Sequence, residues 1–366
     1  MLRRSITGPS AKNQTKLSAA VSNKGMTMLI GASARCAGCR RGELTRTGRV
    51  MGSVATPGLR LFRPGCPQMP FLALVPYYKP FIWELGPVVL DSWALLVSLG
   101  FILGLEVARA RGIQKGLDVR DVVDSAVFVV AMGFLVGHIV HVVAYNPHQL
   151  EEQGIWAILK VWAGFSSTGG FLGAVLGAVL MFQVFPALFG DKRDAAIADG
   201  RSPGALLDWL GRRREFWVHA DTLMYSFPFG WTFGRLGCFT AHDHVGKPSE
   251  FFLAVDFPEA YYGGPRHDLG LYEALWTAVI AATFYALRKA PLRNGFFVAL
   301  WCALYAPARL GFDFLRNTDL STADVRWVGL TPAQWGSIAM AVAGVGVMAW
   351  LLKKGPAPAA EAEGEE

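Results

Sequence analysis

Seven long apolar stretches constrain the fold of this chain more than any other feature of its sequence. Each is about 18 to 23 residues long, which as a helix rising 1.5 Å per residue spans the roughly 30 Å hydrocarbon core of a bilayer. Only 17% of the residues are charged, against about 25% in soluble domains. The sequence therefore predicts an all-α fold, a polytopic membrane helix bundle with about seven transmembrane helices, at residues 87–107, 122–144, 170–189, 219–241, 270–287, 295–315 and 331–352.

The two ends of the chain differ from this apolar part. Residues 1–70 contain twelve Lys or Arg and a single acid, Glu43, and no helical period persists in them. We expect a basic, disordered or processed leader at 1–70, or a start codon assigned too far upstream. Residues 71–353 form the predicted transmembrane domain, and residues 354–366 form a disordered acidic tail.

The net charge of +7 does not indicate a nucleic-acid partner. The positive charge lies in the leader and in short loops, and no basic stripe with interleaved aromatic residues is present. Under the positive-inside rule the more basic loops lie in the cytoplasm together with the C-terminus. These loops are 109–120, 190–217 and 288–293, whereas 145–154, 242–268 and 317–330 are less basic. This topology places the basic leader outside, which conflicts with the positive-inside rule. Long segments obey that rule poorly, so the topology is kept.

One arginine lies within the fourth apolar stretch. The segment 228–246 reads PFGWTFGRLGCFTAHDHVG and places Arg235 among glycines and aromatic residues. An arginine at that depth costs between a few kcal/mol and more than ten, so it must face a protein interior or a wet cavity, where an anion is its natural partner. We interpret this segment as the mouth of a phosphate-binding site.

The sixth stretch carries a second set of polar residues. Tyr305, Arg309, Asp313 and Arg316 lie at i, i+4, i+8 and i+11, which places them on one stripe of a helix. They form either a structural ion pair or a cavity wall in which Asp313 orients Arg309 toward an anionic substrate. With Arg235 added, cations outnumber carboxylates, so a bound anion would balance the charge.

Histidines are the remaining candidates for chemistry. His138 and His141 share one face of the second stretch, whereas His242 and His244 flank Asp243 directly after the membrane arginine. These residues, with His267, fit three roles: hydrogen-bonded structural groups, a metal site, or acid–base groups. An aspartate between two histidines supplies either a general base with an oriented imidazole or a polar helix cap.

The five cysteines do not indicate a metal site. Cys36 and Cys39 form the tightest pair, with Cys66 further on, but a zinc site needs a second pair or nearby histidines. Cys238 and Cys302 lie in apolar stretches and are expected to be small buried apolar residues. We predict no metal ion and no cofactor.

From about residue 81 to residue 352, several blocks of the sequence resemble the prolipoprotein diacylglyceryl transferase family. FGRLGCFTAHDHVGKPSE resembles the family's central motif GRxGNFxNxExxG. RHDLGLYEA resembles RHPSQLYEA, and YAPARLGFDFLRNTD resembles YxxxRFxxEFxRxPD. VGHIVHVVAYNP and the glycine-rich GFSSTGGFLGAVLG match in order before them.

The resemblance implies an enzyme of the bacterial inner membrane. Such an enzyme moves the diacylglyceryl group of phosphatidylglycerol onto the lipobox cysteine thiol next to a prolipoprotein signal peptide, forms a thioether and releases glycerol phosphate. Its expected partners are phosphatidylglycerol, prolipoproteins and membrane lipid. By position, Arg235 matches the arginine that binds the lipid phosphate and Arg309 the second essential arginine. The expected catalytic residues are His242, Asp243, His244 and Arg309, and the expected substrate-binding residues are Arg235, Gly237, Gly246, Tyr305, Asp313, Arg316 and His267.

Several motif positions depart from the family pattern. Thr168 stands where the family has a histidine, Cys238 and Ala241 replace asparagines, and Asp243 and Asp313 replace glutamates. The arginines are retained while proton-handling groups have changed. One interpretation is that His242 and His244 take over that work. The alternatives are a phospholipid-binding paralogue without catalysis, or a metal-dependent membrane enzyme that uses the histidines.

Overall fold

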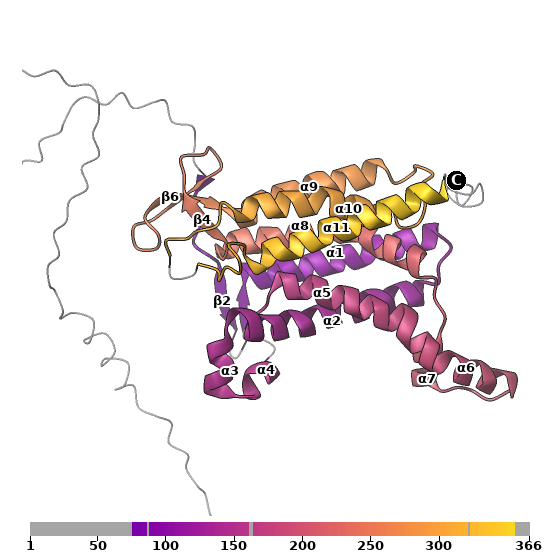
Figure 1. Ribbon diagram of the computed structural model, residues 1–366. Helices are drawn as coiled ribbons and strands as arrows, with labels where there is room; N and C mark the ends of the chain where they lie inside the picture. Colours follow the sequence, from indigo (N-terminus) through magenta and orange to yellow (C-terminus); the bar gives the residue numbers. More distant parts are fainter. Residues whose placement is uncertain (1–74, 86–87, 161–163, 321–322, 356–366) are drawn as a thin grey trace, which may run out of the picture. The chain divides into compact units, whose positions relative to one another are not determined.

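The structure is a computed structural model that describes residues 75–85, 88–160, 164–320 and 323–355 of the 366 (Figure 1). The expected leader at 1–70 and nearly all of the expected acidic tail lie outside the described residues. The same holds for Cys36, Cys39 and Cys66. Those three expectations therefore stay predictions.

Seven long helical segments follow one another in the described part of the chain. The second and third continue through π-helical turns, η1 (His141–Tyr145) and η2 (Leu180–Val184), and the third then extends into α6 (Phe185–Ala198). The short helices α3 (Pro147–Gln153), α4 (Trp156–Leu159) and α7 (Ala205–Gly211) lie in the connections. The long helices are α1 (Ser92–Gln114), α2 (Val119–Val140), α5 (Ser167–Val179), α8 (Phe216–Ala241), α9 (Leu269–Ala286), α10 (Phe296–Asp313) and α11 (Pro332–Lys354).

The predicted polytopic membrane bundle is confirmed. Five of the segments are long and apolar enough to cross a membrane, namely those containing α1, α2, α5, α9 and α11. The two others, α8 and α10, coincide with the predicted stretches that hold Arg235 and Arg309. The first helix begins at Ser92 rather than near residue 87, because the preceding residues pair as a strand.

A small amount of sheet was missed by the all-α prediction. The strands β1 (Val75–Pro76), β5 (Val255–Phe257), β6 (Gly264–Asp268) and β4 (Val245–Pro248) form one sheet in that order, with β1 parallel to β5 and the other pairs antiparallel. A hairpin of β2 (Ile82–Leu85) and β3 (Val88–Asp91) stands apart. Both lie at the end of the bundle opposite α6 and α7 (Figure 1).

This sheet connects the end of α8 to the start of α9. Its buried residues Val245, Val255 and Phe257 pack together. Asp268 closes β6 and caps α9, since its carboxylate accepts a hydrogen bond of 3.3 Å from the backbone N–H of Leu271. The segment 242–268, which the sequence predicts to be a polar loop, is thereby held at the end of the bundle where α8 ends and α9 begins.

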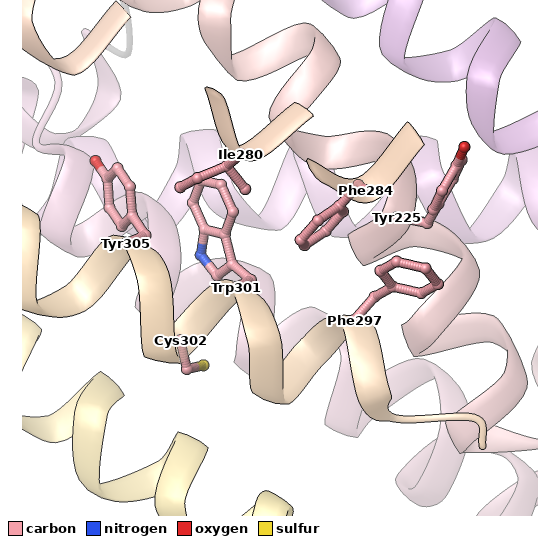
Figure 2. Packing of buried hydrophobic residues seen from close by; sticks show 7 residues of the cluster. All are labelled: Tyr225, Ile280, Phe284, Phe297, Trp301, Cys302 and Tyr305. Atoms are coloured by element: carbon pink, nitrogen blue, oxygen red, sulfur yellow. The ribbon is translucent and has the colours of Figure 1, made fainter. Parts of the chain in front are cut away.

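Aromatic packing fixes α8, α9 and α10 against one another (Figure 2). Trp301 of α10 packs on Phe227 of α8 with ring centroids 4.9 Å apart, and Phe284 of α9 packs on Phe297 of α10 at 4.9 Å. Within α10, Trp301 also stacks on Tyr305 at 4.5 Å. In a bilayer, helices associate through close packing and polar contacts rather than through the hydrophobic effect. The stack therefore sets the position of the Tyr305 hydroxyl at the site described below.

Glycines bring two helix pairs into backbone contact. A Cβ placed on Gly100 of α1 would lie 2.6 Å from the carbonyl oxygen of Gly230 in α8, and one on Gly230 would lie 2.5 Å from that of Gly100. In the glycine-rich α5, a Cβ on Gly173 would lie 2.3 Å from the carbonyl oxygen of Met132 in α2. The close approach expected of this stretch is present.

Substitution of Gly230 by alanine tests this contact. We expect Gly230→Ala to lower the free energy of unfolding by about 1–3 kcal/mol, because the methyl group meets backbone that cannot rotate away. The measurement is thermal unfolding of the detergent-solubilised protein. Gly346→Ala in α11 is the control, since a Cβ there meets nothing within 4 Å. Equal melting temperatures for the two variants would contradict the argument.

Candidate active site: two arginines on one glutamate

Arg235 lies inside the bundle on α8 and is only 2% exposed. Its Nε is 3.0 Å from Glu273 Oε2 on α9, and its guanidinium lies 4.7 Å from the ring centre of Trp231. Its Nη2 is 3.5 Å from the Tyr305 hydroxyl. The arginine therefore faces protein, as the cost of burying its charge requires.

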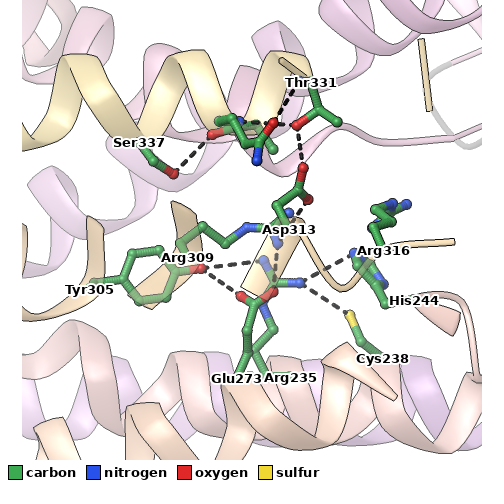
Figure 3. A network of polar contacts seen from close by, with 12 residues as sticks. Arg235, Cys238, His244, Glu273, Tyr305, Arg309, Asp313, Arg316, Thr331 and Ser337 are labelled. Carbon is green, nitrogen blue, oxygen red and sulfur yellow. Dashed lines mark hydrogen bonds and ion pairs between the residues drawn. The ribbon is translucent and has the colours of Figure 1, made fainter. Parts of the chain in front are cut away.

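Arg309 reaches the same carboxylate from α10. Its Nη1 is 3.0 Å from Glu273 Oε1 and 3.4 Å from Asp313 Oδ1. Figure 3 shows the two arginines and Glu273 converging between three helices. The two arginines, which the sequence predicts to face one anion from separate helices, lie together in the structure.

The expected excess of positive charge is not found among the described residues. Glu273 adds a carboxylate that the sequence analysis did not count, and Arg316 pairs with Asp324. Each guanidinium thus has an acidic partner. This balance could not be predicted from the sequence because Glu273 belongs to a third helix, α9, whose neighbours are determined only by the fold.

The ion pairs leave hydrogen-bonding capacity unused. Arg235 Nε, Arg309 Nη1, Glu273 Oε1 and Asp313 Oδ1 are buried and have no hydrogen-bond partner within the described part of the chain, although they lie at ion-pair distances. Buried polar atoms are usually satisfied, and each exception calls for an explanation. Arg235 Nε and Arg309 Nη1 face Glu273 at 3.0 Å, so an anionic ligand would engage these two nitrogens only in place of that carboxylate.

Tyr305 and Asp313 hold the cluster from its two sides. The Tyr305 hydroxyl donates to Glu273 Oε2 at 2.8 Å and lies 3.3 Å from the donating Nε1 of Trp231. Asp313 accepts a hydrogen bond from Thr331, the capping residue of α11. The site therefore joins α8, α9, α10 and the start of α11.

His242 ends α8 in the left-handed conformation, with φ of 52°. Its Nδ1 lies 2.8 Å from Asp268 Oδ2, and its Nε2 lies 3.0 Å from the Tyr78 carbonyl oxygen. The ring also stacks on Tyr77. Because both ring nitrogens are engaged away from the arginines, the geometry favours the helix-cap interpretation for this residue.

The turn made by His242 brings the next two residues back toward the arginines. His244 Nε2 lies 3.4 Å from Arg235 Nη1, and its Nδ1 is hydrogen-bonded to Asp243. Burial opposes charge on His244, yet the Asp243 carboxylate raises its pKa to about 9. Burial likewise opposes charge on Asp243, but the His244 and Arg235 cations lower the pKa of Asp243. The two side chains thus form an ion pair at neutral pH.

The remaining predicted site residues surround this centre. Gly237 lies against Trp93, where a Cβ would come within 3.2 Å of the backbone oxygen, and Gly246 would place one 2.6 Å from the carbonyl oxygen of Leu315. His267 is hydrogen-bonded to the Tyr272 hydroxyl at 2.8 Å. These two side chains help line an apolar cavity of about 510 Å³ between α9, α10 and the segment near Phe251.

The histidines of the second stretch do not join the site. His138 is buried, with its two ring nitrogens 2.9 Å and 3.0 Å from the carbonyl oxygens of Gly164 and Ala157. Thr168 lies within hydrogen-bonding reach of Tyr145, which in turn is within electrostatic reach of Arg309 and Asp324. The metal site proposed from several histidines is therefore not assembled among the described residues.

Comparison with known proteins agrees with this geometry. A family model described as prolipoprotein diacylglyceryl transferase matches residues 80–197 and 203–350. The chain belongs to this family.

Similar proteins named phosphatidylglycerol–prolipoprotein diacylglyceryl transferase come from several bacteria. The one from Nitrosomonas europaea is 26% identical over 284 residues, covering 75% of this chain and 90% of that protein. The one from Pasteurella multocida is 29% identical over 250 residues, which cover 67% of this chain and 81% of that protein. The one from Cupriavidus necator is 28% identical over 293 residues, which cover 77% of this chain and 95% of that protein. The family resemblance expected from the motifs is thus confirmed over most of the chain.

Removing the shared carboxylate tests the cluster. We expect Glu273→Gln to destabilise the protein by about 3–5 kcal/mol, because it leaves a buried guanidinium charge uncompensated. An added anionic phospholipid should restore more stability to this variant than to the wild type, since it returns the missing charge. Thermal unfolding in detergent, with and without the lipid, measures both effects.

Glu106→Gln is the matched control, because Glu106 is an exposed partner of Arg109. Surface pairs of that kind contribute only about 0–1 kcal/mol. If Glu273→Gln behaves like Glu106→Gln, the two arginines do not depend on the shared carboxylate.

Proposed function

We propose that this membrane protein is a phosphatidylglycerol–prolipoprotein diacylglyceryl transferase. Its reaction moves the diacylglyceryl group of phosphatidylglycerol onto the thiol of a prolipoprotein's lipobox cysteine. The names of its relatives supply the substrates. The observation that carries the proposal is the convergence of Arg235 and Arg309 on one buried carboxylate between three helices.

The chemistry requires two things of the site. The sulfur must be deprotonated to attack carbon, and the departing phosphate ester needs cations to stabilise its charge. Arg235 and Arg309 supply the cations, and a planar guanidinium group presents paired N–H donors that fit phosphate oxygens. Tyr305 holds Glu273 in place while the phosphate binds.

The groups around the arginines take supporting roles. Asp243 and His244 stand beside Arg235 and are the proton-handling candidates nearest to it. His242 fixes the turn that presents them. His267 lines the apolar cavity near α9, which is large enough to take part of an acyl chain.

Substitution of the two arginines tests the proposal. In a strain depleted of its own transferase, we expect the wild-type gene to restore lipidation of a prolipoprotein reporter. Arg235→Ala and Arg309→Ala should each abolish it, since each removes a cation from the leaving group. The readout is the electrophoretic shift and mass of the reporter.

Arg201→Ala is the matched control, because Arg201 is exposed and pairs with the exposed Asp199. A wild-type protein that reaches the membrane yet restores no lipidation would contradict the transferase. If native mass spectrometry then showed bound phospholipid without turnover, the protein would be a lipid-binding paralogue. The neutralised arginine cluster and Thr168 are the features that favour that second function.

The proposed location is the bacterial inner membrane, with the C-terminus in the cytoplasm. The last helix, α11, ends with Lys353 and Lys354, and basic residues favour the cytoplasmic side. A green fluorescent protein fused after residue 366 should therefore fluoresce, and an alkaline phosphatase fused there should stay inactive. The opposite pair of results would reverse the topology.

A further inference from the structure

A pocket of about 250 Å³ lies at the end of α8, apart from the arginine cluster. Its walls come from the stretch before α1, from the last turn of α8 and from the loop between β5 and β6. The lining of this tyrosine pocket includes Tyr77, Lys79, Ile82, Ala241, Tyr261 and Tyr262. None of these residues has a role in the reaction proposed above.

Aromatic packing holds the walls of the tyrosine pocket together. Tyr77 stacks on His242 with ring centroids 4.9 Å apart, and it packs against Tyr261 at 5.3 Å. Tyr262 packs edge-on against the buried Phe257 of β5, also at 5.3 Å. The pocket is therefore built by packed side chains of the small sheet and of the turn that ends α8.

The last residue of α8 leaves space in this pocket. Ala241 lines the pocket and stands where the family pattern has an asparagine. A longer carboxamide side chain at that position would occupy part of the space. The size of the pocket thus depends on a residue at which this chain departs from the family motif.

Lys79 gives the pocket its charge. It is exposed and makes no ion pair with any of the described residues. His242 also lines the pocket, but Asp268 and the Tyr78 carbonyl oxygen engage its two ring nitrogens. The tyrosine rings add apolar surface together with hydroxyl groups. This lining fits an acidic side chain, whose carboxylate meets the lysine while its carbon atoms contact the rings.

An open strand edge borders the pocket. β2 begins at Ile82, which lines the pocket, and within the described residues β2 pairs only with β3. The other edge of β2 therefore has backbone N–H and C=O groups without a partner strand. Ile82 and Trp83 are 60% and 55% exposed. An apolar edge of this kind is a template for pairing with another polypeptide, whereas a lipid headgroup cannot extend a sheet.

We propose that the open edge of β2 and the tyrosine pocket beside it bind an extended polypeptide that places an acidic side chain against Lys79. The polypeptide is the prolipoprotein segment that follows the substrate cysteine, and this identification rests on the proposed function. Backbone hydrogen bonds of an added strand supply affinity, and the pocket supplies the preference for one side chain.

The position of the pocket selects this segment of the substrate. The hairpin and the sheet lie at the end of the bundle opposite the end of α11 (Figure 1), which is the outer end in the proposed topology. A signal peptide has an apolar core that stays in the membrane, whereas the chain after the cysteine continues outward.

The distance from the arginine cluster also agrees with this segment. Ala241 and His242 line the pocket, and His244 of the same turn lies beside Arg235. An extended chain advances about 3.3 Å per residue. Residues a few positions after a cysteine bound near Arg235 can therefore reach the pocket.

Photo-crosslinking of the full-length protein in its membrane tests the docking site. Benzoylphenylalanine replaces Trp83 or Tyr261, and a prolipoprotein reporter is co-expressed. We expect each position to give an adduct with the reporter after irradiation. Leu206 of α7 is the control position, because it is 72% exposed at the opposite end of the bundle. No adduct at either position, or adducts only with phospholipid or with a second copy of this chain, would overturn the proposal.

Charge reversal gives a second readout. Lys79→Glu should lower the lipidation rate of a reporter that has glutamate shortly after its cysteine by up to about fivefold, the range of an exposed ion pair. Lysine in place of that glutamate should restore the rate. Lys289→Glu is the matched control, because Lys289 is an exposed lysine that follows α9 at the other end of the bundle. Rates that do not depend on the match of the two charges would count against the pocket.

The two experiments separate the docking site from the transferase. Adducts with the reporter in a protein that restores no lipidation would support the docking site and count against the proposed function. Lipidation without an adduct at Trp83 or Tyr261 would overturn the docking site and leave the transferase standing.

Discussion

The structure depends on two guanidinium groups that share one carboxylate inside the membrane. A lone arginine at that depth costs from a few to more than ten kcal/mol, and an unpaired buried glutamate is also costly. Arg235, Arg309 and Glu273 offset one another only when α8, α9 and α10 are in one register. The polar contact thus selects the arrangement of three helices, and Asp313 extends it to α11.

Apolar packing and the small sheet make that register rigid. The stack of Trp301 on Tyr305 fixes the hydroxyl that orients Glu273. At the end of α8, the His242 turn is held by Asp268, which also caps α9. A single anchor therefore sets both the direction of the loop and the start of the helix that carries Glu273, so the arginine cluster and the neighbouring Asp243–His244 pair are positioned together.

The helices could be predicted because their signal is local: membrane thickness and residue composition fix their length and place. The strands β4 to β6 could not, since they are short, partly polar and defined by partners distant in sequence. The arginines were found from their isolation in apolar stretches. Glu273 was matched to a motif but not to a role, because nothing in the sequence states which helix packs between α8 and α10. His242 and His244 are two residues apart in the sequence, yet His242 contacts Asp268 whereas His244 contacts Arg235. This difference arises from the backbone turn at His242, with φ of 52°, which the sequence does not reveal.

A neutral cluster can still select an anion. A phosphate that enters between Arg235 and Arg309 meets repulsion from Glu273, so simple attraction to excess positive charge does not explain binding. The guanidinium N–H groups of Arg235 and Arg309 give directional hydrogen bonds that only a correctly placed oxygen can accept. The Tyr305 hydroxyl contacts both Glu273 and Arg235, so it can keep the carboxylate hydrogen-bonded when a guanidinium turns toward the ligand. Selectivity in such a site comes from geometry, and the closed ion pairs keep the arginines from costing stability while no lipid is bound.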